Sequence, residues 1–277
     1  MVLFERDGQS IYNSGDLKKW EYQSHIGGFW ECPELFQLPI DGDTKRQKWV
    51  LYGMSGTYMI GDFDGKQFKP ETEKLKYYDG PQMAPQTYNN IPASDGRRIQ
   101  IGWGSIVQRG MPFNQMMMFP TSLSLRSTKI GPRLFSEPVS EISQLHTKTH
   151  KWSNLSAAEA NEKVKIVSGD LFRVKMKIEI TDGTHYEIKY KGNRIAYYDM
   201  NHNKLNNVFY PGDNIEALTM DLEILIDKTS LELFADKGKF TIISPLPESR
   251  NNTGFEFGGN IKIHALEIHE LKSVWLR

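Results

Sequence analysis

Alternation of apolar and charged residues with a period of two constrains the fold of this sequence most. In residues 171–180 every even position is apolar, from Phe172 to Ile180, while Arg173 and its odd-numbered neighbours are mostly charged. Successive side chains of a strand point to opposite faces, so this pattern predicts a half-buried β-strand. The Asp-Gly pair within residues 181–184 then predicts a hairpin turn, with the return strand at 186–190.

The same alternation returns further along the chain. Apolar residues alternate over 222–226 and 231–233, on either side of a turn at 227–230, and again over 261–265. Several short alternating strands joined by turns are typical of an antiparallel β-sandwich. We therefore predict this fold for the C-terminal half.

Short strands separated by Asp-Gly turns characterise the N-terminal half. Strand-like runs occupy residues 49–52, 58–61 and 99–103, and Asp-Gly pairs begin at residues 41, 64, 79 and 95. Evenly spaced short strands indicate a propeller or a barrel. The polar segment 138–161 joins the halves, and Ser156 and Glu159 have the spacing of a capping box, which predicts one short helix. We place the domains at residues 1–145 and 146–277.

Composition excludes several classes of function. Thirty-four Lys and Arg balance thirty-four Asp and Glu, so the chain has no overall charge to attract nucleic acid or an anionic membrane. No apolar run approaches the roughly 18 residues of a membrane span. Residues 1–8 place charges directly after a short apolar run, so no export signal is expected within this chain.

Cysteine and histidine give no metal or cofactor signal. Cys32 is the single cysteine, which excludes an intramolecular disulfide and a zinc site built from cysteines. His146 and His150 are four residues apart, a ligand spacing on a helix, but their polar context favours a solvated loop. We expect neither a metal nor a cofactor.

The segment with the strongest chemical signal surrounds Glu31. Trp30 and Cys32 flank this carboxylate, and Pro33 follows. Apolar neighbours disfavour the charged form and raise a carboxyl pKa, which suits a general acid. The alternative interpretation is structural, with Glu31 paired to a nearby Arg.

The same segment closely resembles the Glu-Cys-Pro signature of glycoside hydrolase family 32, the invertases, inulinases and levanases that cleave β-fructofuranosides. The matching residues run from Trp30 to Phe36, Trp-Glu-Cys-Pro-Glu-Leu-Phe. Further segments resemble the family in its own order: residues 12–20, 61–68, 84–88, 97–103, 117–125 and 225–235. The resemblance covers almost the whole chain.

This resemblance implies an all-β protein, a five-bladed β-propeller with its site in the axial funnel, followed by a C-terminal antiparallel β-sandwich. It implies that Glu31 is the general acid/base and that the substrate is a fructose-containing saccharide. Trp30, Gln86 and Trp103 match family segments near the funnel and are expected to bind the sugar. Cys32 is expected to shape the surroundings of the acid.

A retaining mechanism needs a second carboxylate, about 5–5.5 Å from the first. In the family this nucleophile belongs to an Asn-Asp-Pro-Asn segment, and another Asp, in Arg-Asp-Pro, stabilises the transition state. Neither motif occurs here. Asp7 precedes Gly8 and is predicted to lie in a hairpin turn, while Glu34 is three residues along an extended strand and is expected on the opposite face from Glu31.

We therefore expect a family member that begins inside a partial propeller and is inactive alone. An open propeller edge would favour self-association or a complementing chain. The alternative is a non-catalytic fructan-binding or interaction protein. We expect the full-length parent to be secreted or periplasmic, because fructans are extracellular polymers.

Overall fold

The computed structural model describes residues 1–108, 110, 112–210, 219–249, 251 and 253–275. The chain forms two compact units. The first comprises Met1–Ser105 and Arg109–Val139, and the second comprises Ile106–Gln108 and Ser140–Arg277. The first unit therefore ends at Val139, a few residues before residue 145. The domain boundary at residue 145 stays a prediction.

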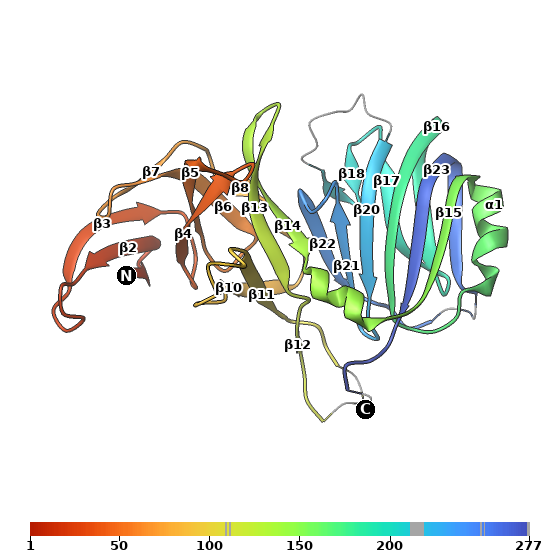
Figure 1. The fold of residues 1–277 in the computed structure, drawn as a ribbon, viewed down its shortest axis with the longest axis horizontal. Helices are drawn as coiled ribbons and strands as arrows, with labels where there is room; N and C mark the ends of the chain where they lie inside the picture. Colours follow the sequence, from red (N-terminus) through yellow and green to blue (C-terminus); the bar gives the residue numbers. More distant parts are fainter. Residues whose placement is uncertain (109, 111, 211–218, 250, 252, 276–277) are drawn as a thin grey trace. The chain divides into compact units, whose positions relative to one another are not determined.

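The first unit contains a three-stranded sheet and a ten-stranded sheet, and the larger sheet is made of two antiparallel series of strands (Figure 1). The smaller sheet contains β1 (Val2–Glu5), β2 (Gly8–Asn13) and β3 (Glu21–Gly27). The first series contains β4 (Glu34–Ile40), β5 (Asp43–Tyr52), β6 (Thr57–Phe63) and β7 (Phe68–Pro70). The second series contains β10 (Gln82–Thr87), β11 (Arg98–Gly104), β13 (Thr121–Thr128) and β14 (Gly131–Pro138). These two series are joined by a parallel pairing of β13 with β4 at Leu125 and Ile40. Successive antiparallel series of this size are the blades of a partial β-propeller.

Short elements complete this unit. They are β8 (Leu75–Lys76), β9 (Tyr78–Asp79) and β12 (Met116–Met117). The Asp-Gly prediction is confirmed at residues 41–42, which join β4 to β5, and at residues 64–65 between β6 and β7. Buried aromatic rings pack edge to face in this unit. The ring centroids of Phe36 and Tyr52 are 5.5 Å apart, and those of Tyr58 and Tyr77 are 5.7 Å apart.

The second unit is a β-sandwich with one short helix. It begins with η1 (Ser140–Leu145), β15 (His146–Ser156), α1 (Ala157–Lys163) and η2 (Val164–Ile166). It continues through β16 (Phe172–Tyr190), β17 (Asn193–Asp199), β18 (Lys204–Leu205) and β19 (Val208–Phe209). It ends with β20 (Thr219–Ile226), β21 (Ser230–Ala235), β22 (Phe240–Pro245) and β23 (Phe255–Leu271).

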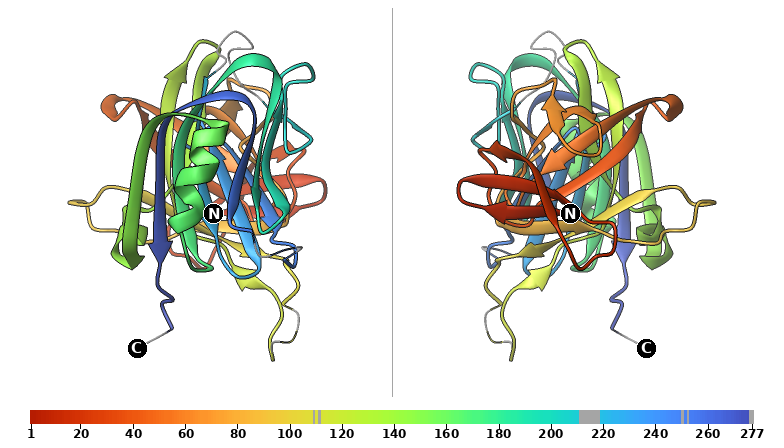
Figure 2. Two further views of the ribbon diagram at one scale, coloured as in Figure 1. Left: turned by 90° about the vertical axis from the view of Figure 1, so that its right-hand side faces the viewer. Right: turned by 90° about the vertical axis from the view of Figure 1, so that its left-hand side faces the viewer.

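Two local predictions in this unit are confirmed. Ser156 caps α1, and Ser156 and Glu159 form both hydrogen bonds of the capping box. The helix lies against β15 and β23 (Figure 2, left). β20 and β21 form the predicted hairpin, with Ile226 opposite Leu231.

The predicted hairpin at Asp182-Gly183 is wrong, because β16 runs unbroken through these residues (Figure 1). β23 pairs with it along both halves, from Phe172 opposite Glu270 to Tyr190 opposite Phe255. The register shifts between residues 180 and 187, so the Asp-Gly pair makes an irregularity within one strand. The first half of β16 also pairs with β20 and the second with β17, which places the halves in the two layers of the sandwich.

The loop predicted for His146 and His150 is also wrong, because both residues lie in β15, which pairs with β23. Most residues of β15 are polar and exposed, which makes the strand look like a linker in sequence. No helix in the described part of the chain combines the length and apolar character needed to cross a bilayer.

Candidate active site

Glu31 lies in the turn between β3 and β4, and its side chain is exposed. The apolar enclosure expected from its neighbours does not form. The Trp30 ring is 58% exposed and packs beside Phe4, with 5.4 Å between ring centroids. No Arg in the described residues forms an ion pair with Glu31, so the structural alternative stays a prediction. Glu31 is a solvent-facing carboxylate.

The backbone of this turn is held at Cys32. Cys32 has a φ of 53°, in the left-handed region, and its carbonyl accepts a hydrogen bond of 3.3 Å from Nε2 of Gln86. Burial raises the pKa of the Cys32 thiol, and the adjacent charge of Glu31 raises it further. The thiol therefore stays protonated at neutral pH and is no nucleophile.

A pocket of about 390 Å³ adjoins the turn. It is lined by Val2, Leu3, Phe4, Cys32, Pro33 and Gln86. The structure thus brings together two of the residues singled out in sequence, Cys32 and Gln86, next to Trp30 and Glu31. Trp103 does not line this pocket. It lies on β11, 40% exposed, opposite Met83 of the strand that carries Gln86.

Glu34 has a structural role that the sequence did not reveal. Its half-buried carboxylate accepts hydrogen bonds from the Tyr52 hydroxyl, from the Thr87 backbone N–H at 3.0 Å and from the Thr87 hydroxyl. Arg98 donates to the same Thr87 hydroxyl at 3.1 Å. These partners are distant in sequence, so no local motif could have indicated the network.

Asp7 lies in the two-residue turn between β1 and β2, as predicted. Its exposed carboxylate is 3.3 Å from Nε2 of His25, whose Nδ1 is 3.0 Å from the Ser10 hydroxyl. The Ser-His-Asp order resembles a nucleophilic triad, but Ser10 is only 2% exposed. A buried hydroxyl cannot reach a substrate, so this chain of contacts joins β2 to β3 structurally.

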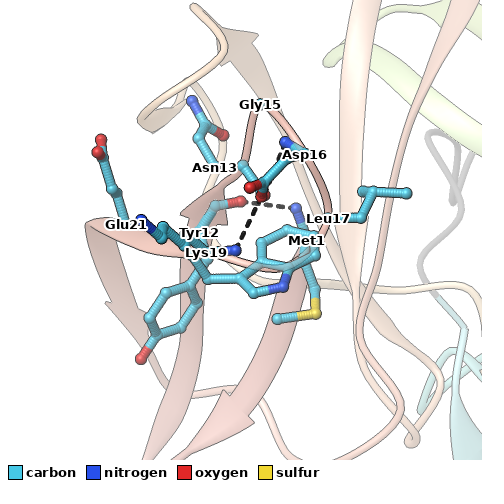
Figure 3. Close-up of a pocket in the computed structure, with 10 residues that line it drawn as sticks. Met1, Tyr12, Asn13, Gly15, Asp16, Leu17, Lys19 and Glu21 are labelled. Atoms are coloured by element: carbon cyan, nitrogen blue, oxygen red, sulfur yellow. Dashed lines mark hydrogen bonds between the residues drawn. The ribbon is translucent and has the colours of Figure 1, made fainter.

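A larger pocket of about 700 Å³ lies at the connection between β2 and β3 (Figure 3). Asp16 accepts hydrogen bonds of 2.8 Å from the backbone N–H groups of Lys18 and Lys19, which hold its pKa below the usual range. No residue proposed from sequence lines this pocket. The described residues also include no group of three or more His, Cys, Asp or Glu placed to bind a metal ion.

Comparison with known proteins places these features in a family. Residues 3–138 match the glycosyl hydrolases family 32 N-terminal domain. The levanase of Bacillus subtilis (strain 168) is 31% identical over 99% of this chain and 48% of its own length. An extracellular exo-inulinase of Aspergillus ficuum is 26% identical over 96% of this chain and 60% of its own length. The chain thus spans about half the length of these relatives.

Solved structures share the fold. The exo-inulinase of Aspergillus awamori superposes with a TM-score of 0.74 at 19% identity, covering 97% of this chain and 63% of that one. The fructan 1-exohydrolase IIa of Cichorium intybus gives a TM-score of 0.71 at 17% identity, covering 96% and 67%. The Trp-Glu-Cys-Pro turn, the partial propeller and the sandwich agree with these matches, and the chain belongs to glycoside hydrolase family 32.

Proposed function

We propose that this chain takes part in the hydrolysis of β-fructofuranosides of the levan, inulin or sucrose type, with Glu31 as the general acid/base. The observation that carries the proposal is an exposed carboxylate on a turn with the family's Glu-Cys-Pro sequence. The relatives named levanase and exo-inulinase support the substrate class.

In this mechanism Glu31 donates its proton to the glycosidic oxygen as the bond from that oxygen to the anomeric carbon breaks. A second carboxylate attacks the anomeric carbon and forms a covalent fructosyl intermediate. Glu31, now a carboxylate, then removes a proton from water, which displaces the second carboxylate and releases fructose. No cofactor enters these steps.

We assign the second carboxylate to residues outside this sequence, either elsewhere in the same polypeptide or in a complementing chain. Within the chain, Glu34 is occupied by donors from Tyr52 and Thr87, and Asp7 sits in a turn beside His25. The chain alone should therefore release no fructose. Association with a complementing chain, or with a second copy, belongs to the same proposal.

Four residues are proposed to bind the sugar around Glu31. The exposed side chains of Trp30 and Trp103 can stack on the apolar face of a fructosyl unit, and the amide oxygen of Gln86 can accept hydrogen bonds from its hydroxyls. Cys32 closes the pocket beside them. We also propose export of the full-length protein, since one relative is named an extracellular enzyme.

The test measures fructose release from levan, inulin and sucrose. It compares the chain alone with the chain extended at its N-terminus by a family segment that bears Asn-Asp-Pro-Asn and Arg-Asp-Pro. Release by the extended protein, abolished by Glu31→Gln, supports the proposal. Release that persists in Glu31→Gln refutes the role of Glu31.

A non-catalytic fructan-binding function is the second candidate, favoured by the exposed Trp30 and Trp103 in a chain without a family nucleophile motif. Calorimetric titration with levan oligosaccharides separates the two. Binding that is lost in Trp30→Ala, with no fructose released by the extended protein, would favour this second function.

A further inference from the structure

A buried side chain from a distant strand holds the turn that carries Glu31. Gln9 lies in β2 and is 0% exposed. Its Nε2 donates to the carbonyl of Tyr52 at 3.2 Å and to the carbonyl of Trp30 at 3.5 Å. One amide thus connects the sheet of β1–β3, the end of β5 and the peptide bond that precedes Glu31.

The residue after Tyr52 brings the turn against β5. A Cβ at Gly53 would lie 2.6 Å from the carbonyl oxygen of Trp30 and 3.2 Å from that of Glu31. It would also lie 3.3 Å from Nε2 of Gln9. Only a residue without a side chain allows the turn to approach the strand end this closely, so the position of Glu31 depends on this contact.

The buried amide of Gln9 would lower the stability of the fold if it served only to fill space. Both neighbouring groups are carbonyl oxygens, so the NH₂ end must face them, and the buried Oε1 has no partner among the described residues. A buried polar atom without a partner destabilises the folded state, and an aliphatic side chain would avoid that penalty. The donor function of the amide accounts for its presence.

We propose that Gln9 is a positioning residue for the acid/base Glu31, an inference that rests on the proposed function. Gln9 fixes the carbonyl on the N-terminal side of Glu31, and Gln86 fixes the carbonyl of Cys32 on its C-terminal side. With both sides held, the backbone at Glu31 is fixed, and with it the direction in which the side chain leaves the chain. General acid catalysis requires this, because misplacement by about 1 Å can lower a rate up to roughly 100-fold.

Amide chemical shifts of the chain as it is test the positioning directly. Gln9→Leu removes the donor to the carbonyls of Trp30 and Tyr52, so it should shift the amide resonances of Glu31 and Gly53, which share those peptide groups, more than the amide resonances of β4. Ser10→Ala is the matched control, because Ser10 is buried on the same strand and its partner is His25. This control should leave the Glu31 and Gly53 resonances unchanged.

Activity of the N-terminally extended protein gives the second readout. Gln9→Leu should lower kcat by roughly 10- to 100-fold while KM changes by less than about threefold, because the substrate contacts remain. If Gln9→Leu does not fold, Gln9→Met removes the same donor with an unbranched chain of similar length.

A Glu31 amide resonance that does not move in Gln9→Leu, or an unchanged kcat, would overturn the proposal. If the extended protein with Gln9 intact releases no fructose, the proposed function fails. The chemical-shift measurement then still decides whether Gln9 holds the turn.

Discussion

Replacing Glu34 by Ala should destabilise the first unit strongly, although Glu34 lies only three residues from the exposed Glu31. The carboxylate accepts hydrogen bonds from the Tyr52 hydroxyl and from two groups of Thr87. Tyr52 is 0% exposed and Thr87 is 8% exposed, so water cannot readily replace the lost acceptor.

The magnitude follows from the stranded donors. Each buried donor left without a partner costs about 1–3 kcal/mol of folding free energy. The neighbouring side chains can partly rearrange, so the three donors together cost less than the sum of their separate penalties. We expect Glu34→Ala to lose about 3 kcal/mol. For a unit of this size, a loss of that magnitude lowers Tm by roughly 6–12 °C. Glu34→Gln retains an acceptor and should lose less.

Tryptophan fluorescence during thermal unfolding measures this loss, because Trp20, Trp30, Trp49 and Trp103 all lie in the first unit. Glu31→Ala is the matched control. Its side chain is exposed, so its effect should stay within about 0.5 kcal/mol. Equal Tm values for Glu34→Ala and Glu31→Ala would refute the assignment of Glu34 to a structural network.

Three further predictions concern the sandwich. Burial lowers the pKa of His269 to about 4 and also lowers the pKa of His146, whose ring stacks on that of His269 with 4.0 Å between centroids. As the pH falls, the unfolded chain binds protons at these histidines before the folded chain does, so the free energy of unfolding, measured with urea, should decrease from about pH 6.5 towards pH 4. Tyr210→Phe removes the hydroxyl that donates to the half-buried Asp236 and should cost about 1–3 kcal/mol in the same assay. Gly259→Ala should lower Tm in calorimetry, because φ is +104° and the new Cβ would lie 2.7 Å from a backbone oxygen.

Controls for these predictions use the same unit. Gly254→Ala meets no atom within 4 Å and should leave Tm nearly unchanged. Stability that stays constant between pH 6.5 and pH 4 would contradict the histidine argument. A Tyr210→Phe variant as stable as the parent would mean that the Asp236 carboxylate does not depend on that donor.

Local signals in the sequence predicted those features that depend on neighbouring residues. The capping box at Ser156 and the hairpin around residues 227–230 both formed, because their hydrogen bonds join groups a few positions apart. The Asp182-Gly183 hairpin failed for the opposite reason. The long strand β23 pairs along both halves of β16, and this distant pairing overrides the local turn preference.

In the candidate site too, features set by neighbouring residues were predicted and features set by distant contacts were not. The Trp-Glu-Cys-Pro segment indicated Glu31 and its neighbours from sequence alone. The exposure of Glu31 was not predicted, because the position of the Trp30 ring beside Phe4 of another strand has no signal in the local sequence. Gln9, Gly53 and the partners of Glu34 gave no sequence signal, since each acts through a contact at least eighteen positions away.

Fructose release from levan by the N-terminally extended protein, with Glu31 and with Glu31→Gln, decides whether Glu31 is the general acid/base. We expect release with Glu31, none by the chain alone, and a loss of roughly 10²- to 10⁴-fold in Glu31→Gln, the usual contribution of a general acid. Equal rates for the two extended proteins, or release by the unextended chain, would contradict this expectation.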